Sequence, residues 1–187
     1  YILSRENKLP FVTCKLAISK DLFTINKKKK WITNKYSRGR VHLMRSNHDS
    51  IIISSRTIRI DNPLLNCRIN GLESTSPSRI ILDNYLKISP KSNVIKDSFK
   101  YRTIVFYNMY NKKKVELLKN LGVKSYKISV NINGDLNLKK ALIKARELGF
   151  SRIFIESGLK LARNFLKENL VNYLKIFISN EKLNNNG

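Results

Sequence analysis

The chain has 187 residues, 42% of them hydrophobic, which is enough for one buried core, so a single domain is expected. Its formal net charge of +24 would suit a nucleic-acid-binding protein. However, Lys outnumbers Arg 25 to 12, whereas phosphate recognition favours arginine forks, and no apolar run reaches the roughly 18 residues of a membrane span.

The predicted elements alternate between strands and helices along the chain. The first half is expected to hold a strand at residues 11–18, a helix capped by Thr33 or Asn34 and running to about Asn47, and strands at residues 50–55 and 78–83. After a polar connection at residues 87–100, the second half is expected to hold strands at 102–107, 124–130, 152–156 and 173–179 and helices at 112–121, 138–148 and 159–170.

This alternation predicts an α/β fold in three layers, with a mostly parallel central sheet and helices on both faces. The run Ile51-Ile52-Ile53 supports it, because a strand that is apolar on both faces is typical of a parallel sheet covered on both sides.

Ligands bind open α/β sheets at the carboxyl ends of the strands. Glu156-Ser157-Gly158 follows a predicted strand and precedes a predicted helix, so its small residues would let a pyrophosphate approach the helix N-terminus. A plain tight turn would look the same. The Gly-rich pattern of a Rossmann site and the P-loop pattern are both missing from the sequence.

Single residues elsewhere carry weaker signals. Arg45 and Arg68 could be surface arginines, and Asp61 before Asn62-Pro63 could simply form a turn. Cys14 and Cys67 show no CxxC spacing, and the two histidines are poorly spaced for one metal, so no zinc site is expected. Few cysteines and no apolar signal segment in residues 1–8 favour a cytoplasmic protein.

Several segments of the chain form an ordered set: Pro10-Phe11-Val12-Thr13 with Lys15-Leu16-Ala17; Trp31-Ile32-Thr33; Arg45; Thr57 with Asp61-Asn62-Pro63, Leu65 and Cys67-Arg68; Arg79-Ile80-Ile81-Leu82-Asp83; and Glu156, Gly158, Leu161 and Ala162. Taken in this order, they resemble the reductase domain of bacterial riboflavin biosynthesis, whose fold is similar to that of dihydrofolate reductase. The segment from Thr57 to Arg68 is the most specific of them.

The resemblance implies an NADPH-dependent reductase that opens the ribosyl group of 5-amino-6-(5-phosphoribosylamino)uracil to the ribityl compound by hydride transfer to C1′. It implies cofactor contacts from Ala17, Trp31, Thr57, Asp61, Asn84, Gly158, Leu159, Lys160, Leu161 and Ala162. It implies substrate contacts from Lys15, which would face the pyrimidine edge, Lys29, Arg45, Leu65, Arg68 and Glu156. Guanidinium forks suit the phosphate. No catalytic acid is assigned.

The resemblance further implies a homodimer formed through the sheet edge and an N-terminal zinc deaminase domain in the full-length protein. Residues 1–10 would then be a linker and residues 11–187 the reductase domain, shortened at its C-terminal end. Three positions depart from the family pattern, which has Gly at Leu22, Ser at Lys29 and a second turn glycine at Ser157.

Other interpretations stay open. A sibling reductase of the same fold could act on the diaminopyrimidinone precursor or on a pterin. A basic nucleic-acid-binding domain would require an exposed face of aromatic and arginine residues with a known motif, which the sequence does not show. A non-catalytic remnant would keep the fold and lose NADPH binding.

Overall fold

The computed structural model describes residues 9–24, 28 and 32–184, which are built around a seven-stranded sheet of order β5-β4-β3-β2-β6-β1-β7. The strands are β1 (Phe11–Ile18), β2 (Ser50–Ser54), β3 (Ser78–Leu82), β4 (Thr103–Tyr107), β5 (Lys124–Lys127), β6 (Arg152–Glu156) and β7 (Tyr173–Ile178). All neighbouring strands of this described sheet pair in parallel. The predicted parallel sheet is therefore confirmed.

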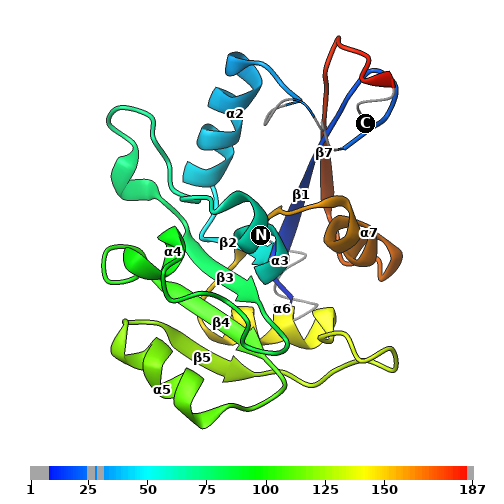
Figure 1. Ribbon diagram of the computed structural model, residues 1–187. Coiled ribbons are helices and arrows are strands. Elements are labelled where there is room, and N and C mark those ends of the chain that lie inside the picture. Colours follow the sequence, from blue (N-terminus) through cyan, green and yellow to red (C-terminus); the bar gives the residue numbers. More distant parts are fainter. Residues whose placement is uncertain (1–8, 25–27, 29–31, 185–187) are drawn as a thin grey trace.

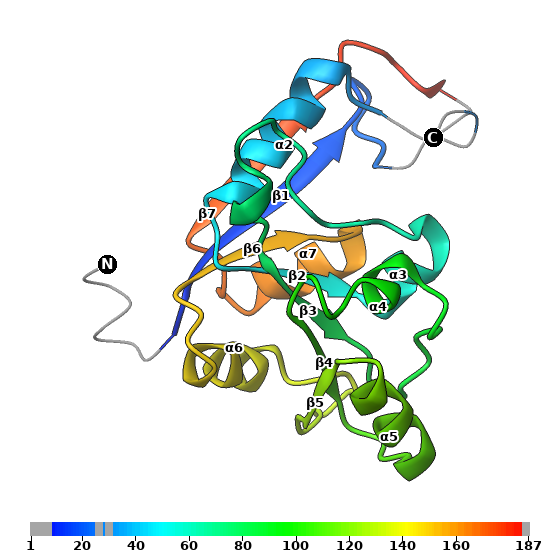
Figure 2. The same ribbon diagram turned by 90° about the vertical axis from the view of Figure 1, so that its left-hand side faces the viewer.

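Helices cover both faces of the sheet (Figures 1 and 2). They are α2 (Lys35–Ser46), α3 (Ser55–Asp61), α4 (Asn93–Lys96), α5 (Lys112–Asn120), α6 (Leu138–Glu147) and α7 (Leu159–Lys167), with a 3-10 turn at Glu73–Thr75. Alternate residues of one strand face opposite ways, so the sheet supplies two cores. Ile52 packs with α6 and α7 residues, whereas Ile51 and Ile53 pack with residues of α2 to α5.

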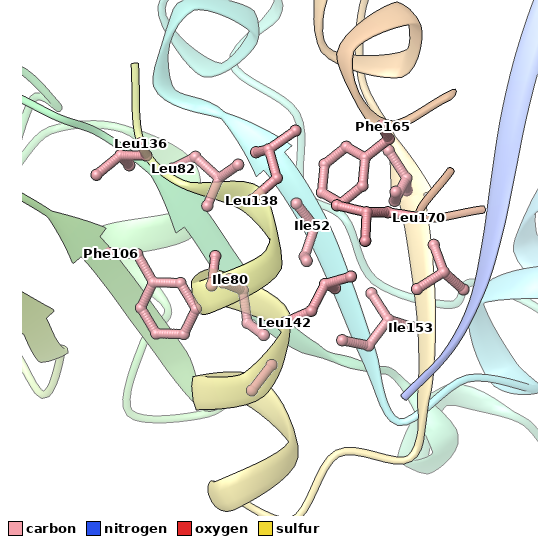
Figure 3. Packing of buried hydrophobic residues seen from close by; sticks show 14 of the residues in the cluster. Ile52, Ile80, Leu82, Phe106, Leu136, Leu138, Leu142, Ile153, Phe165 and Leu170 are labelled. Carbon is pink, nitrogen blue, oxygen red and sulfur yellow. The ribbon is translucent and has the colours of Figure 1, made fainter. Parts of the chain in front are cut away.

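Figure 3 shows the core on the α6 side. Leu138 and Leu142 of α6 lie over Ile52 and Ile80 of the sheet, and Phe165 of α7 continues the same cluster. Burial of such side chains contributes about 1.5–3 kcal/mol each, which makes these clusters the main source of stability. No helix of the described residues is both long and apolar enough to cross a membrane.

Most predicted helices begin where a cap was available in the sequence. The side chains of Asn34, Asn111 and Asn137 each accept a hydrogen bond from a backbone N–H in the first turn of α2, α5 and α6. The predicted strand at 124–130 is shorter in the structure, where β5 ends at Lys127 and Val130 forms an isolated antiparallel bridge with Leu136.

Two short helices were not predicted. Helix α3 follows β2 directly and is capped by the Ser54 side chain, and it ends at Asn62, whose φ of 41° is left-handed. Helix α4 lies in the segment predicted as a polar connection, and Asn93 at its start makes two hydrogen bonds to Asn62, at 2.9 and 2.8 Å. Tertiary hydrogen bonds thus hold helices that are too short to be stable alone.

Arg79 of β3 is a fully buried cation that ties these segments together. Its guanidinium forms an ion pair with Asp97, stacks 4.7 Å from the Tyr101 ring and donates to the Leu64 carbonyl at 2.6 Å. Tyr101 in turn accepts a 3.5 Å hydrogen bond from the Asn66 side chain. Through these contacts Arg79 fixes the loop that follows α3 to the sheet.

We expect Arg79→Met to lower the free energy of unfolding by about 3 kcal/mol, because it leaves Asp97 and the Leu64 carbonyl without a buried cation. Urea unfolding followed by circular dichroism measures this change. Arg152→Met is the matched control, since Arg152 is exposed at the start of β6 and its loss should change stability by less than about 0.5 kcal/mol. Equal stability of the two variants would contradict the anchoring role of Arg79.

Candidate functional site

The order of the strands in the sheet reverses between β1 and β2. Strand β6 lies between β1 and β2, so the chain passes over β6 on its way from β1 to β2. Such a switch in strand order is where open α/β sheets bind ligands. Glu156 is the last residue of β6 and so lies at the carboxyl end of that strand, and the register pairs it with Lys15 of β1.

Arg45 of α2 reaches this strand end and binds Glu156 in a two-pronged ion pair. Its Nε and Nη2 donate to the two carboxylate oxygens of Glu156 at 2.8 and 2.7 Å, and its Nη1 donates to the Asn66 carbonyl at 2.9 Å. The side chains are only 9% and 20% exposed, so water screens the pair weakly. Arg45 was predicted to contact substrate, and in this structure most of its guanidinium is engaged by protein.

The charges at this strand end shift one another's pKa. Burial raises the pKa of Glu156, but the charge of Arg45 and its hydrogen bonds outweigh that effect and lower the pKa on balance. Burial likewise lowers the pKa of Lys15, against the opposite effect of the Glu156 carboxylate. The Glu156 carboxylate is therefore ionised and paired with Arg45.

This arrangement predicts a pH dependence of stability. A carboxyl group whose pKa is lower in the folded protein than in the unfolded chain stabilises the fold above its unfolded value, near 4.5, and loses that contribution as the pH falls. Between about pH 6 and pH 3 the wild type should therefore lose more unfolding free energy than Glu156→Gln. Urea titrations across this range test it. Parallel pH curves for the two proteins would contradict the ionised pair.

Arg68 is exposed and lies near Arg45, since both contact Asn66. Its Nη1 donates to the Asn66 side-chain oxygen at 2.9 Å, and its backbone N–H donates to Nδ1 of His42 at 3.1 Å. No role in the site was predicted for His42 or Asn66. The available signal was the spacing of His42 and Arg45, which are three residues apart and therefore share one face of α2.

A second group of residues joins the turns after β2 and β6. The hydroxyls of Ser54, Thr57 and Ser157 lie within hydrogen-bond distance of one another, at 2.9 Å for Ser54 to Thr57, 3.2 Å for Thr57 to Ser157 and 3.3 Å for Ser157 to Ser54. Ser157, where the family pattern has glycine, thus links α3 to the start of α7. Gly158 is the N-cap residue of α7 and has no side chain to compete for the first N–H groups of that helix.

Leu22, the other departure that the structure describes, keeps the backbone shape that glycine would favour. Its φ is 68°, and its N–H donates to the Ser19 carbonyl at 3.0 Å within the turn after β1. A left-handed leucine costs about 1–2 kcal/mol. The turn is held by Asp21, which accepts from Ser19 and from the backbone N–H groups of Leu183 and Asn184.

The remaining predicted contacts lie in different surroundings. Asp61 is exposed at the end of α3, one turn from Thr57, and Ala17 is half-buried in β1. Leu65 is 2% exposed and packs into the core on the α2 side, with φ at 57°. Asn84 follows β3 and its side chain donates to the Gly134 carbonyl at 2.9 Å. Lys29 and Trp31 lie outside the described residues.

The structure thus brings together two groups of predicted residues at the carboxyl ends of the strands. One group is ionic and contains Lys15, Arg45, Arg68 and Glu156, and the other contains Thr57 and the start of α7, residues 158–162. Among the described residues, no cluster of three or more His, Cys, Asp or Glu side chains could hold a metal ion.

Comparison with known proteins places this arrangement in a family. Residues 10–180 match the model of the RibD C-terminal domain. The riboflavin biosynthesis protein RibD of Aquifex aeolicus (strain VF5) is 34% identical over 172 residues, which are 91% of this chain and 46% of that protein. The 5-amino-6-(5-phosphoribosylamino)uracil reductase of Buchnera aphidicola subsp. Acyrthosiphon pisum (strain APS) is 28% identical over 161 residues, 80% of this chain and 74% of that protein.

A solved structure shows the same fold. The diaminohydroxyphosphoribosylaminopyrimidine deaminase/5-amino-6-(5-phosphoribosylamino)uracil reductase of Thermotoga maritima superposes with a TM-score of 0.77 at 25% identity, over 97% of this chain and 48% of that one. The predicted dihydrofolate reductase-like fold is confirmed. The chain spans about half the length of the RibD proteins it matches. From its sequence and its fold, the chain belongs to the family of RibD C-terminal domains.

Proposed function

We propose that this chain is an NADPH-dependent reductase of riboflavin biosynthesis, which converts 5-amino-6-(5-phosphoribosylamino)uracil into the ribitylamino product. The observation that carries the proposal is that two half-sites lie together at the carboxyl ends of the strands. The ionic residues around Glu156 and Arg68 form one half-site, and the hydroxyl-bearing residues Thr57 and Ser157 belong to the other. The two half-sites lie side by side because Glu156 and Ser157 are adjacent in the chain. The reductases among the relatives carry the name of this activity.

The second half-site fits a dinucleotide. The nine-residue helix α7 begins at Leu159, after its N-cap residue Gly158, so its first N–H groups can bind a pyrophosphate. Three hydroxyls stand next to that helix start and can donate to phosphate or ribose oxygens. We assign NADPH to residues 158–162, Thr57 and Asp61, with Ala17, Trp31 and Asn84 as further contacts taken from the family resemblance.

The first half-site fits a phosphorylated ribosylaminopyrimidine. The exposed Arg68 guanidinium is the cation best placed for the phosphate, since Arg45 is largely engaged by Glu156. Lys15 and Glu156, which the register pairs across β1 and β6, are assigned as donor and acceptor for the polar edge of the substrate. Lys29 is a further substrate contact taken from the family resemblance, whereas Leu65, which is 2% exposed, supports the site from the core.

NADPH, when bound, supplies the hydride that is transferred to C1′ of the sugar. The side chains of this chain then hold the two reactants in line and surround them with fixed charges. Lys15 and Glu156 orient the pyrimidine, while Arg68 fixes the opposite, phosphorylated end of the substrate. These roles require the carboxyl end of β6 to stay in place, and the Arg45–Glu156 ion pair holds it to α2.

A homodimer formed through the β7 edge is part of the proposal. Strand β7 ends the sheet and exposes apolar side chains, with Ile176 49% exposed and Ile178 65% exposed. A bare apolar edge strand is a ready template for pairing with another chain. Light scattering that gives twice the monomer mass for the wild type, and a smaller mass after Ile178→Lys, would support this edge.

The full-length protein is proposed to carry an N-terminal zinc deaminase domain, joined by a linker that ends near residue 10 and followed by the reductase domain from residue 11. The support is the half-length match to RibD proteins and the double activity named for the Thermotoga maritima relative. A cytoplasmic location is supported by the two cysteines, Cys14 and Cys67, which are both free and buried.

Titration of the protein with NADPH at about 150 mM salt, followed by addition of the substrate, tests the proposed function. Binding followed by loss of the near-ultraviolet absorbance of NADPH is the expected result. Binding with turnover only of the diaminopyrimidinone precursor would identify a sibling reductase. An absence of NADPH binding would refute the proposal, because the half-site at α7 would then have no ligand.

A further inference from the structure

We propose that His42 is a positioning residue of the substrate site, which in its neutral form holds the Arg68 backbone and thereby directs the Arg68 guanidinium toward the substrate phosphate. This inference rests on the proposed reductase function and adds to it a residue with no role in the family motif quoted above. It is carried by one hydrogen bond, in which the Arg68 N–H donates to Nδ1 of His42 at 3.1 Å.

That hydrogen bond fixes the tautomer of His42. A ring nitrogen that accepts a hydrogen bond carries no proton, so the proton of a neutral His42 is on Nε2. A protonated imidazole would turn an N–H group against the Arg68 N–H and break the contact. The neutral form is therefore the one that positions Arg68.

The surroundings of His42 favour the neutral form. Burial lowers the pKa of His42, and the cations Arg45, from the same helix, and Arg68, from the facing loop, lower it further. The Asn66 backbone and the Glu156 carboxylate act in the opposite direction without reversing the shift. His42 thus remains an acceptor near neutral pH.

His42 also closes a ring of contacts between α2 and the loop after α3. Arg45 donates to the Asn66 carbonyl at 2.9 Å, the Asn66 side chain accepts from Arg68 at 2.9 Å, and Arg68 returns to His42. His42 and Arg45 lie on one face of α2, so the helix contacts the loop at two points. Removal of the His42 contact should loosen Arg68 and leave the buried Arg45–Glu156 pair in place.

The test compares His42→Leu, which removes the acceptor, with His42→Asn, whose Oδ1 lies close to the position of Nδ1. His42→Leu should raise the KM for the substrate about 5- to 10-fold, the effect of one lost hydrogen bond, with kcat and the Kd for NADPH within about twofold of wild type. His42→Asn should restore the KM to within about twofold. A purely structural role of His42 would lower the melting temperature and leave the KM unchanged.

His48→Asn is the matched control. His48 lies just beyond α2, makes contacts to the Met44 carbonyl at 2.6 Å and the Thr13 hydroxyl at 3.0 Å, and belongs to neither half-site. Its replacement should leave the substrate KM unchanged. Nitrogen-15 spectra of histidine-labelled wild type should show Nδ1 of His42 unprotonated near neutral pH.

The failures of the inference and of the proposed function are distinguishable. If the wild type oxidises NADPH normally and His42→Leu has the wild-type KM, the inference alone is overturned. A protonated Nδ1 in the nitrogen spectra overturns it as well. If the wild type binds no NADPH and oxidises none with the substrate, the proposed function fails, and the role of His42 fails with it.

Discussion

Arg45→Met is expected to lower the free energy of unfolding by about 3 kcal/mol and to reduce kcat/KM about 100-fold or more. The loss of stability arises because Glu156, which is only 20% exposed, keeps its charge and loses its partner. The loss of activity arises because Arg45 also donates to the Asn66 carbonyl. Without Arg45, both the end of β6 and the loop after α3, which carries Arg68, would move. Urea unfolding and steady-state oxidation of NADPH measure the two effects.

The double variant Arg45→Met/Glu156→Leu separates these effects. Replacement of both members of a buried ion pair by apolar residues is often neutral for stability, so the double variant should recover most of the lost unfolding free energy. It should not recover activity, because the site would have lost its carboxylate and one of its cations. A double variant that is as active as wild type would show that the pair has no part in the reaction.

The sheet and the longer helices could be predicted because each carries its signal locally. Ile51-Ile52-Ile53 is apolar on both faces, and Asn34, Asn111 and Asn137 each stand at the N-cap of a helix. Burial and capping act over a few residues, which a sequence pattern records directly. The order of the strands, with β6 between β1 and β2, was not predicted, because no local pattern records which strands are neighbours in the sheet.

Helices α3 and α4 were missed because their stability is not local. Helix α3 has seven residues and α4 has four, and their ends are joined by the hydrogen bonds between Asn62 and Asn93, which are 31 positions apart. Arg79 supports the same loop from β3, and no role inside the core was predicted for it. Long-range contacts of this kind leave no periodic trace in the sequence.

The candidate site shows the same division. The resemblance supplied the positions of Arg45, Arg68 and Glu156, and the structure places them at one strand end. It could not show that Arg45 is bound to Glu156, a residue 111 positions away, and so is largely occupied by protein. His42 was missed for a related reason, because its partner is the backbone N–H of Arg68, and any residue could have supplied that group.

Arg68→Ala is expected to raise the KM for the substrate about 10- to 100-fold, because it removes charge-assisted hydrogen bonds to the phosphate. The Kd for NADPH should change by less than about twofold, since Arg68 belongs to the other half-site. Arg68→Lys should fall between the two proteins, because lysine keeps the charge and loses the planar fork. Steady-state kinetics together with NADPH titration of each variant measure these effects.

Asp61→Ala is the matched control for this prediction, because Asp61 is assigned to the other half-site. Asp61 stands at the end of α3, on the side of Thr57, so its loss should weaken NADPH and leave the substrate KM nearly unchanged. Opposite effects of the two variants would establish that Arg68 and Asp61 serve different ligands. If Arg68→Ala instead left the substrate KM at the wild-type value, the phosphate would have to be bound elsewhere. Arg45 would be the next candidate, and binding there would require its ion pair with Glu156 to open first.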